Sequence, residues 1–574
     1  MFVIACWGFG RALIGRWIDR SVQDQPLAEA LCIGLGMGLQ IVLFQALGAV
    51  SLFVPMAVPV VNAAGVIAAG FQLPQLLAAM RAAPPPTEAR MSWLEKVAML
   101  GLALVAIPSL VAPLAPPIAF DELMYHLPYA RQVAESGSLG IHEWLRYPWF
   151  PYNFNLLYAA ALMVGDDVLP HFLNALAGWL SVFMIYRLGR MHASRVVAAV
   201  GAAIWLGVGD YSNALIDMGV ALFVLCAFVS LCAWQAEGKG RGLHGLVLAA
   251  FFLGLAAGSK YQALTFLPLA AVFVAWRERR IKAWALGLLS FLLPCIYWYA
   301  RNAITTGDPF NPIGARIFGF TNWIAADYEQ QLEDVRLHAA LPSFLIWPIV
   351  LAPFSTAWRA SPVLRAAMVF CVYAIVVWLL TSRYPRYLTA AYPLIALMAV
   401  FGWQVLVGWL GAGWRRLAPT KPGGMVEHRL ATIGLMALSA GLVAASAWQT
   451  VRKVELVAAP PAEREAVLRR NVPGYAVMSH LRQHVRGRVY QVALSEAIYY
   501  GPNPIYGDAL GPWRYRDFVA LPPAELARKL GGQGFEAIVT TVPLAQIMAA
   551  QPGFGRHFEV LVERDGARAY RILP

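Results

Sequence analysis

Two adjacent carboxylates stand just after a long apolar stretch of the chain. Residues 97–115 are almost all apolar and, with their flanks, long enough to cross a bilayer. Asp121 and Glu122 follow, with Tyr125 and His126 one helical turn further on. Desolvating two carboxylates at a membrane boundary is costly, so such a pair is typical of a functional site. The alternative is a helix N-terminus, where the helix dipole favours acidic residues.

These residue types allow two kinds of chemistry. A carboxylate at this place could act as a general base toward a hydroxyl group. Asp121, Glu122 and His126 could instead hold a divalent cation such as Mg²⁺ or Mn²⁺.

Further ionisable residues lie at the ends of other apolar stretches. Asp217 opens one of them and is a candidate second acid, with Asp210 as its rival and helix capping as the alternative role. Lys260 lies in a very short turn, where it could bind a lipid phosphate or extend toward lipid headgroups. Guanidinium groups, which match phosphate oxygens but could also pair with nearby acids, belong to Arg301, Arg383 and Arg386.

Aromatic residues accompany these charges. Tyr147 lies in a segment of mixed aromatic and polar residues, 142–153. Sugars have an apolar face and a rim of hydroxyls, which such a mixture suits, although an aromatic belt at the membrane interface would look the same. We predict catalytic roles for Asp121, Glu122 and Asp217. We predict substrate contacts for Tyr125, His126, Tyr147, Lys260, Tyr261, Arg301, Arg383, Arg386 and Tyr387.

The composition is that of a membrane protein. Of the 574 residues, 59% are hydrophobic and 13% are charged, and the mean hydropathy is +0.58. Soluble proteins carry roughly 25% charged residues. The net charge of +13 is explained by Lys and Arg in short loops between apolar stretches, so no nucleic-acid partner is expected. The six cysteines lie in apolar segments without metal-ligand spacing and are expected to be buried.

Apolar stretches near the length needed to cross a bilayer recur along the chain. They lie at 27–48, 51–79, 97–115, 168–187, 196–209, 215–235, 243–258, 261–276, 283–300, 341–357, 362–381, 386–411 and 430–448. Residues 1–17 contain Arg11 and Arg16 and are a weaker candidate, without the cleavage site of a removable signal peptide. We predict a polytopic α-helical membrane protein with about 13 transmembrane helices.

Every second loop between these stretches is basic. The basic residues are Arg81, Arg90, Lys96, Arg187, Arg190, Arg195, Lys239, Arg241, Arg277, Arg279, Arg280, Lys282, Arg359, Arg365, Arg415, Arg416 and Lys421. The positive-inside rule places these loops in the cytoplasm. The loops 116–167, 210–214, 259–260, 301–340 and 382–385, and everything after 449, are then expected outside, with Asp121 among them.

The composition changes after the last apolar stretch, where Arg, Glu, Pro and Gly become frequent. Residues 488–494 and 535–542 are predicted to be buried strands, and 524–534 a helix that ends at glycine. Asp565-Gly566 marks a hairpin. We expect a small α/β domain at 455–574. It follows additional helices at 1–92 and a catalytic helical region at 93–450, with outer loops 116–167 and 301–340.

Taken in order, these segments resemble a known class of membrane enzyme. The segments are FDELMYHLPYA, Asp217 at the head of a span, GLAAGSKYQAL, WYARNAITTGDPFNP and RYPRYLTAAYPLIAL. They resemble the GT-C class of integral membrane glycosyltransferases over about 93–400. Within that class they resemble the phospholipid-carrier-dependent group, which includes protein O-mannosyltransferase relatives and the aminoarabinose transferase that modifies lipid A.

The resemblance implies a helical bundle whose active site lies between outer loops and the membrane. Asp121 matches the catalytic carboxylate of the class and Asp217 its second acidic position, while Lys260 and Arg386 match basic positions near a lipid phosphate. About 90 residues precede the usual start of the family core, and the C-terminal segment resembles no acceptor-specific module. The acceptor, which could be a lipid, a glycan or a protein, therefore stays open.

The expected function is transfer of a sugar from a polyprenyl-phosphate donor to an acceptor hydroxyl, with inversion. The expected place is the periplasmic face of the bacterial cytoplasmic membrane, with the active site and the C-terminal domain on that side. A divalent cation is optional, because the lysine and arginines could balance the phosphate charge. The alternatives are a polysaccharide ligase or polymerase that uses a diphosphate-linked glycan, a flippase or transporter for lipid-linked sugars, and a non-catalytic assembly protein.

Overall fold

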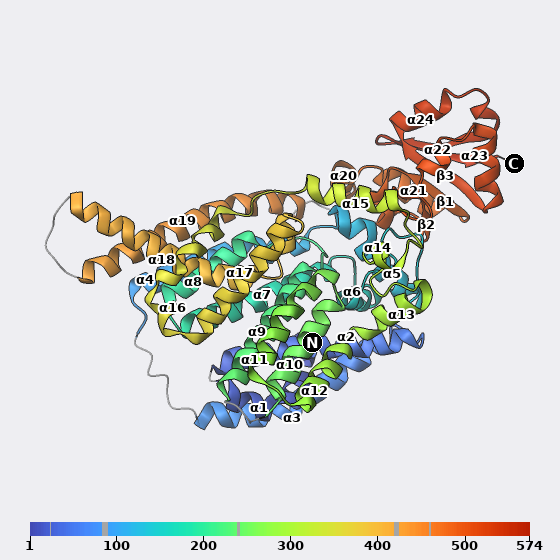
Figure 1. Ribbon diagram of the computed structural model, residues 1–574. Coiled ribbons are helices and arrows are strands. Elements are labelled where there is room, and N and C mark those ends of the chain that lie inside the picture. The colour runs from blue at the N-terminus through green and yellow to red at the C-terminus, as the bar shows by residue number, and fades with distance from the viewer. Residues whose placement is uncertain (23, 83–89, 238–241, 418–423, 458–460, 574) are drawn as a thin grey trace.

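The computed structural model describes residues 1–22, 24–82, 90–237, 242–417, 424–457 and 461–573. In these residues the chain forms a large helical bundle with a small α/β domain at one end of it (Figure 1). Three basic residues predicted to lie in cytoplasmic loops, Lys239, Arg241 and Lys421, fall outside the described residues.

The first helix, α1 (Phe2–Ser21), packs closely against both of the helices that follow it, α2 (Gln25–Ala49) and α3 (Ala57–Ala82). A Cβ atom added at Gly10 would lie 1.9 Å from the carbonyl oxygen of Cys32, and one added at Gly36 would lie 1.8 Å from that of Cys6. Such a close approach of two helix backbones requires glycine. Helix α2 also contacts the helices that follow, so the N-terminal helices are part of the bundle.

The remaining long helices complete the bundle. They are α4 (Trp93–Val111), α7 (Leu169–Arg190), α8 (Arg195–Val208), α9 (Asp217–Ala236), α10 (His244–Ala257), α11 (Leu267–Arg277), α12 (Ile281–Leu292), α17 (Pro362–Leu380), α18 (Tyr392–Leu417) and α19 (Gly424–Val457). Within the described residues, eight helices of the bundle are long and apolar enough to cross a membrane, or nine if one bent pair is a single span. All eight coincide with spans predicted from the sequence. The protein is therefore a multi-pass membrane protein.

Proline breaks several of the other predicted spans. The stretch 261–276 is divided into a 3₁₀ segment, η3 (Tyr261–Phe266), and α11, which has Pro268 near its start. The stretch 283–300 bends by 74° between α12 and α13 (Ile296–Thr306), next to Pro294. The stretch 341–357 contains a 3₁₀ segment, η4 (Phe344–Phe354), with two internal prolines. Because proline has no N–H group and clashes with the preceding turn, these stretches do not form straight α-helices.

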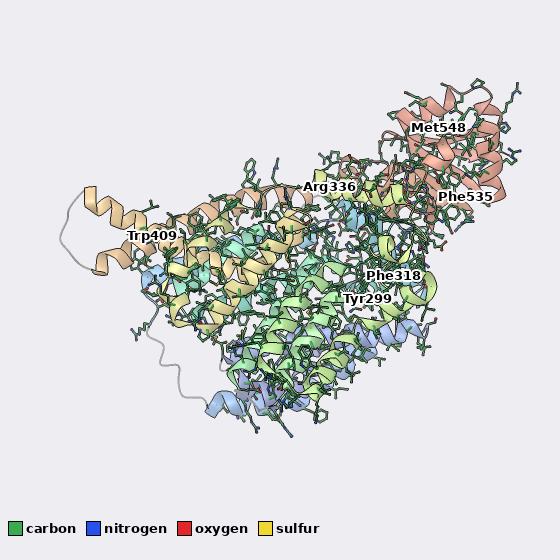
Figure 2. All side chains as sticks on the ribbon, in the orientation of Figure 1. Tyr299, Phe318, Arg336, Trp409, Phe535 and Met548 are labelled. Atoms are coloured by element: carbon green, nitrogen blue, oxygen red, sulfur yellow. The ribbon has the colours of Figure 1, made fainter. Side chains whose placement is uncertain are left out.

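Short elements gather at one end of the bundle, which we call the site end. They are η1 (Ala112–Leu114), the π-turn η2 (Glu122–His126), α5 (Leu127–Ser136), α6 (Asn153–Val164), α13, α14 (Ala315–Phe318), α15 (Ala325–Leu337) and η5 (Pro385–Leu388). Figure 2 shows Phe318 and Arg336 near the α/β domain, with Trp409 toward the opposite end. Helix α6 is buried and apolar but was predicted to be part of a loop, because its 12 residues are too few to signal a span.

Two of the basic residues predicted for cytoplasmic loops, Arg187 and Arg280, lie away from the site end. Arg187, at the far end of α7, pairs with Asp24 at 2.7 Å. Arg280 lies beyond the far end of α11 and pairs with Glu278 at 2.6 Å. Helices α7 and α9 begin at the site end, whereas α8 and α10 end there. The alternation of basic and non-basic loops in the sequence therefore follows the alternating direction of the helices. A short helix, α16 (Thr356–Ala360), precedes α17.

The C-terminal domain is a mixed sheet with helices on it. Its helices are α20 (Pro461–Asn471), α21 (Tyr475–His484), α22 (Arg516–Val519), α23 (Pro523–Gly532) and α24 (Val542–Ala549), with 3₁₀ segments η6 (Ser495–Tyr500) and η7 (Phe554–Arg556). Its strands are β1 (Arg488–Val492), β2 (Ile505–Tyr506), β3 (Phe535–Thr541), β4 (Phe558–Arg564) and β5 (Ala567–Ile572). The strand order is β2-β1-β3-β5-β4, with β1 parallel to β2 and β3, and β5 antiparallel to β3 and β4. Asp565 and Gly566 have φ values of 45° and 79°, as a tight hairpin turn requires.

Buried ion pairs fix this domain to the site end. Asp327 of α15 is fully buried and accepts hydrogen bonds from Arg514 at 2.5 Å and Arg516 at 2.6 Å. Arg146, which precedes α6, donates from Nε to Asp508 at 2.7 Å. These contacts hold α15 and the segment that precedes α6, and both border the cavity described below. The position of both segments therefore depends on the C-terminal domain.

We expect Asp327→Ala to loosen the domain from the bundle. The substitution leaves Arg514 and Arg516 without their shared counter-charge, which costs about 3 kcal/mol when one partner of a buried pair is removed. The expected result is a lower thermal unfolding temperature in detergent and faster amide hydrogen exchange in α15. The matched control is Glu329→Gln on the same helix, because its pair with Arg316 is exposed and such pairs contribute about 0–1 kcal/mol. An equal effect of both substitutions would contradict the docking role.

Candidate functional site

Four charged side chains from segments far apart in the sequence meet at the site end. Arg386 donates from Nη1 to Oδ2 of Asp121, and from Nε to Oδ2 of Asp217 at 2.8 Å. Lys260 donates from Nζ to Oδ1 of Asp217 at 2.6 Å. We call these four residues the ion cluster. Each was a predicted site residue, and the structure brings them together.

Local structure explains how each member is placed. Asp217 is the first residue of α9, and Lys260 follows the tight turn that ends α10. Arg386 lies in η5, a single turn that begins at Pro385, whose ring fixes the backbone at the start of the turn. Asp121 directly precedes η2. The rival acid Asp210 is exposed and binds the loop residues after it, so the structure places Asp217, and not Asp210, in the cluster.

The cluster balances two negative and two positive charges. Its side chains are only 12% to 26% exposed, so each charge needs a partner. Burial opposes ionisation of Asp121, but the charge and hydrogen bond of Arg386 hold the pKa of Asp121 below its ordinary value. Burial likewise opposes the charge of Arg386, yet the two carboxylates raise its pKa well above the usual range. Both groups are therefore ionised at neutral pH.

The ion cluster opens into a cavity of about 880 Å³ with a polar end and an apolar end. The polar end is formed by Asp121, His126, Arg146, Lys260 and Arg386. The apolar end is formed by Phe266, Leu388 and Ala391, and by Ala374, Val377 and Trp378 of the membrane-span candidate α17. Asp217 is not among the lining residues and lies behind the two cations. A ligand that fills this cavity would have a charged or polar head and an apolar tail.

The predicted aromatic residues surround the polar end. Tyr125, Tyr147, Tyr261 and Tyr387 all line the cavity. Tyr147 donates its hydroxyl to Gln331 of α15 at 2.7 Å, and Nζ of Lys260 lies 5.2 Å from the ring centroid of Tyr387. These contacts set the rings around the ion cluster, where an apolar ring face and a hydroxyl are both within reach of a polar ligand.

His126 is a buried neutral histidine at the same wall. Burial lowers the pKa of His126 to about 3, and its Nδ1 lies 3.1 Å from the side-chain amide of Asn155. Within the described part of the chain, Nε2 has no hydrogen-bond partner. At neutral pH the ring is therefore uncharged.

Two predicted arginines are not part of the cavity. The guanidinium of Arg301 lies against Trp298 and Trp149, with its Cζ atom 5.1 Å and 6.0 Å from the ring centroids. Arg383 is exposed and donates to the carbonyl of Leu379 at 3.1 Å. Neither lines the cavity, so of the predicted arginines only Arg386 joins the ion cluster.

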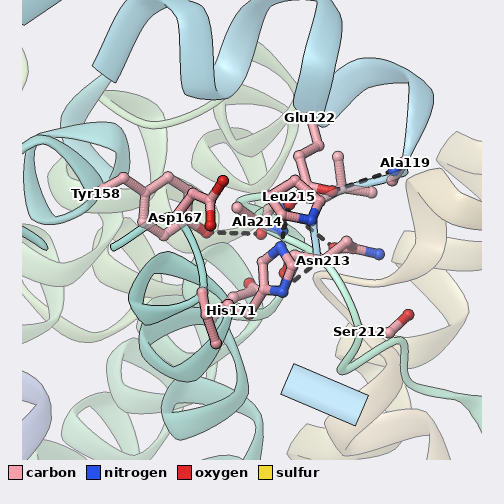
Figure 3. Close-up of polar contacts among 12 residues, drawn as sticks. Ala119, Glu122, Tyr158, Asp167, His171, Ser212, Asn213, Ala214 and Leu215 are labelled. Carbon is pink, nitrogen blue, oxygen red and sulfur yellow. Dashed lines mark hydrogen bonds and ion pairs between the residues drawn. The ribbon is translucent and has the colours of Figure 1, made fainter. Parts of the chain in front are cut away.

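Glu122 lies in a buried network (Figure 3), whereas the neighbouring Asp121 pairs with Arg386. Its Oε1 accepts hydrogen bonds from Nε2 of His171 and from the backbone N–H of Ala214 at 2.7 Å. Its Oε2 accepts from the N–H of Ala119 at 3.2 Å. Glu122 and His171 are both fully buried. The network ties the segment before Asp121 to the loop that leads into Asp217.

The direction of the Glu122 side chain matters for the metal site predicted at Asp121, Glu122 and His126. Consecutive residues of a helical turn point in different directions, so the carboxylates of Asp121 and Glu122 diverge and Asp121, Glu122 and His126 do not converge on one point. Among the residues that the structure describes, no group of three or more His, Cys, Asp or Glu is arranged to hold a metal ion. A divalent cation remains a prediction.

Several residues of the site were not predicted. His171 was missed, although an ionisable residue within an apolar span is itself a signal of a functional position. Gln262, Trp323 and Gln331 line the cavity, but they lie in segments without a recognisable pattern. Arg146 was noted only as one polar residue among aromatics, and its contact with Asp508 depends on the docking of the C-terminal domain.

We infer that Glu122 is a positioning residue, and we expect Glu122→Ala to destabilise the site end. The substitution leaves His171 and the N–H of Ala214 without a buried partner, at a cost of about 3 kcal/mol. Glu122→Gln, which keeps an acceptor oxygen, should cost less. The measurement is thermal unfolding in detergent, together with hydrogen exchange of residues 210–216. Glu333→Gln, an exposed carboxylate-to-amide change on α15, is the control. Full stability of Glu122→Ala would contradict the inference.

Comparisons with known sequences match parts of the chain. A family model described as SF2091/S2213 matches residues 463–571, which form the C-terminal domain. The uncharacterized protein SF2093/S2215 of Shigella flexneri is 40% identical over 75 residues, covering 13% of this chain and 38% of that protein. The uncharacterized protein SF2092/S2214 of Shigella flexneri is 26% identical over 144 residues, covering 23% of this chain and 78% of that protein. The chain thus matches well under half the length of the first of these relatives.

Two solved structures share the fold over most of the chain. ArnT from Cupriavidus metallidurans, determined with bound undecaprenyl phosphate, superposes with a TM-score of 0.52 at 14% identity, covering 84% of this chain and 98% of that chain. The apo Archaeoglobus fulgidus oligosaccharyltransferase superposes with a TM-score of 0.50 at 11% identity, covering 82% and 73%. At such low identity the likeness concerns the fold. This chain is a multi-pass membrane protein with the GT-C fold, as its sequence motifs predicted.

Proposed function

We propose that the protein is a glycosyltransferase that moves a sugar from a polyprenyl-phosphate donor to an acceptor hydroxyl. The observation that carries this proposal is the shape and lining of the cavity, whose charged end continues into an apolar end on α17. A polyprenyl-phosphate sugar has the same division between a polar head and a long apolar tail. The GT-C neighbour that was determined with bound undecaprenyl phosphate supports the same ligand class.

The positive-inside rule supports an orientation for this reaction. The ends of the helices that carry Arg187 and Arg280 would face the cytoplasm. The ion cluster and the C-terminal domain would then face the periplasm of a bacterial cytoplasmic membrane. In that orientation the apolar end of the cavity borders the lipid, and the charged end lies near the membrane surface.

Lys260 and Arg386 would bind the donor phosphate. During transfer the acceptor oxygen forms a bond to the anomeric carbon while the bond from that carbon to the phosphate oxygen breaks. The polyprenyl phosphate departs with the electron pair, and the two cations stabilise the negative charge that develops on it. A direct displacement of this kind inverts the anomeric carbon.

Asp121 would orient the acceptor hydroxyl and take up its proton. In the ion cluster Asp121 is a weak base, because Arg386 stabilises its ionised form. A donor phosphate that competes for Arg386 would weaken this pairing and raise the basicity of Asp121. Donor binding and activation of the acceptor would thus be coupled through one shared guanidinium.

Asp121→Asn is expected to abolish most of the transfer, because an amide can neither take up the proton nor balance Arg386. Removing a general base costs about 10²–10⁴-fold in rate. The assay uses the purified full chain in detergent with radiolabelled polyprenyl-phosphate sugars and membrane extract. Asp565→Asn is the control, since asparagine tolerates the positive φ of that exposed turn. Transfer from diphosphate-linked glycans but from no monophosphate donor would favour a ligase or polymerase instead.

The pH profile of transfer should depend on Arg386. Asp121 must be ionised, so activity falls as the pH drops through its pKa, which in the natural chain Arg386 holds below the ordinary value of an aspartate. In Arg386→Gln burial remains and the counter-charge is gone, so the pKa of Asp121 rises and the acid limb of kcat/KM moves to higher pH. Arg386→Lys keeps the positive charge, so the acid limb of its kcat/KM profile should stay at low pH, although its rate of transfer falls. An unmoved limb in Arg386→Gln would contradict the role of Asp121.

A further inference from the structure

A second cleft lies between the C-terminal domain and the segments that precede α6. Its volume is about 700 Å³, which is within the ~300–1,000 Å³ of ordinary ligand sites. One side is formed by Gln132, Ile141, His142, Glu143, Trp144, Trp149 and Thr305, and the other by Arg488, Pro504, Tyr506 and Trp513. Figure 1 shows β1 and β2, which carry Arg488 and Tyr506, at the side of the domain that faces the bundle.

The walls of this cleft hold an unusual number of polar atoms without partners. Within the described residues, four buried atoms of its lining have no hydrogen-bond partner: Nε2 of His142, Nε1 of Trp149, Nε of Arg488 and Nε1 of Trp513. A buried polar atom without a partner costs about 1–3 kcal/mol. Their concentration in the residues around one cleft means that this region holds hydrogen-bond donors that the described residues leave unused.

The hydrogen-bonding properties of these atoms limit which class of ligand the cleft can bind. The indole and guanidinium nitrogens are obligate donors, so they require acceptor oxygens. The half-exposed Gln132 and the exposed Glu143 can accept hydrogen bonds in return. The flat faces of Trp144, Trp149, Tyr506 and Trp513 suit an apolar ring surface. A pyranose has such a surface together with hydroxyls that both donate and accept.

Two arginines contact the aromatic residues of the walls. The Cζ atom of Arg488, which itself lines the cleft, lies 4.1 Å from the ring centroid of Tyr506 and 5.4 Å from that of Trp513. On the opposite side, Arg301 lies against Trp149. This explains the position of Arg301, which the sequence suggested as a phosphate ligand. Both guanidinium groups hold their aromatic partners by cation–π contacts.

We propose that this cleft binds a carbohydrate chain, and that this chain is the acceptor of the proposed transferase. The second part rests on the function proposed above. The two cavities share one wall, the segment 147–150: Tyr147 and Phe150 line the first, and Trp149 lines the second. The carbonyl of Trp149 is held by Asn302 at 2.8 Å and by the hydroxyl of Tyr261 at 3.0 Å. A glycan in the cleft would therefore lie next to the cavity that receives the donor.

The test is equilibrium binding of the purified full chain in detergent. The probe is an array of neutral gluco-, galacto-, manno- and N-acetylglucosamine oligosaccharides together with bacterial surface polysaccharide fragments. The variants are Trp513→Phe, which keeps an aromatic ring but loses the N–H, and Gln132→Ala. The control is Gln546→Ala on α24, at the far side of the domain (Figure 1).

We expect at least one carbohydrate to bind the natural chain and to lose about tenfold in affinity in Trp513→Phe. Gln132→Ala should weaken binding of the same carbohydrate, and Gln546→Ala should bind it unchanged. Binding of no carbohydrate, or binding that both cleft variants leave unaltered, would overturn the proposal. Carbohydrate binding that the cleft variants weaken, in a natural chain that transfers sugar from no donor, would overturn the proposed transferase and leave the carbohydrate cleft standing.

Discussion

Arg386 donates to both Asp121 and Asp217, and this shared guanidinium joins three segments that are distant in the sequence. Each carboxylate alone would be costly to hold at a largely buried position, and each cation likewise. Together with Lys260 they form a cluster in which two carboxylates pair with two cationic side chains. Any phosphate that enters the cavity must compete with carboxylates for these cations, so binding a ligand rearranges charge that is already in place.

Two further groups of polar contacts hold the segments around the ion cluster in place. The buried network of Glu122, His171 and the N–H of Ala214 fixes the distance between the loop of Asp217 and the segment of Asp121. Asp327 binds Arg514 and Arg516 of the C-terminal domain and thereby holds α15 along the cavity. Asp121 and Glu122 are adjacent in the sequence but make different contacts, because successive side chains on a helical turn point apart.

The position of the cavity relative to the membrane-span candidates is equally important. Proline-containing breaks near Lys260, after α12 and in η4 interrupt the helices. Two of these breaks border a cavity: η3 lines the first, and Thr305 of α13, after the bend that follows α12, lines the second. The two cavities lie on either side of residues 147–150. One has an apolar end on α17, and the other is completed by the C-terminal domain.

The sequence alone determined the class of the protein, its long spans, and the strands and hairpin of the C-terminal domain. These depend on local hydrophobic patterns, which are visible without knowing what they pack against. The GT-C fold was expected from the resemblance of several motifs, taken in their order along the chain, to a known family. It also identified Asp121, Asp217, Lys260 and Arg386, because charges at the ends of apolar spans are rare. Buried α6 and the 3₁₀ segments were missed, since tertiary packing and proline, and not hydrophobicity, determine their form. Only the tertiary structure decided that Glu122 turns to His171, that Arg301 supports Trp149, and that a second cleft opens beside the first cavity. Neither the direction of a side chain nor a partner far away in the sequence produces a periodic pattern in the chain. Such groups meet only when the chain folds, which is the physical reason why the tertiary structure was needed to find these contacts.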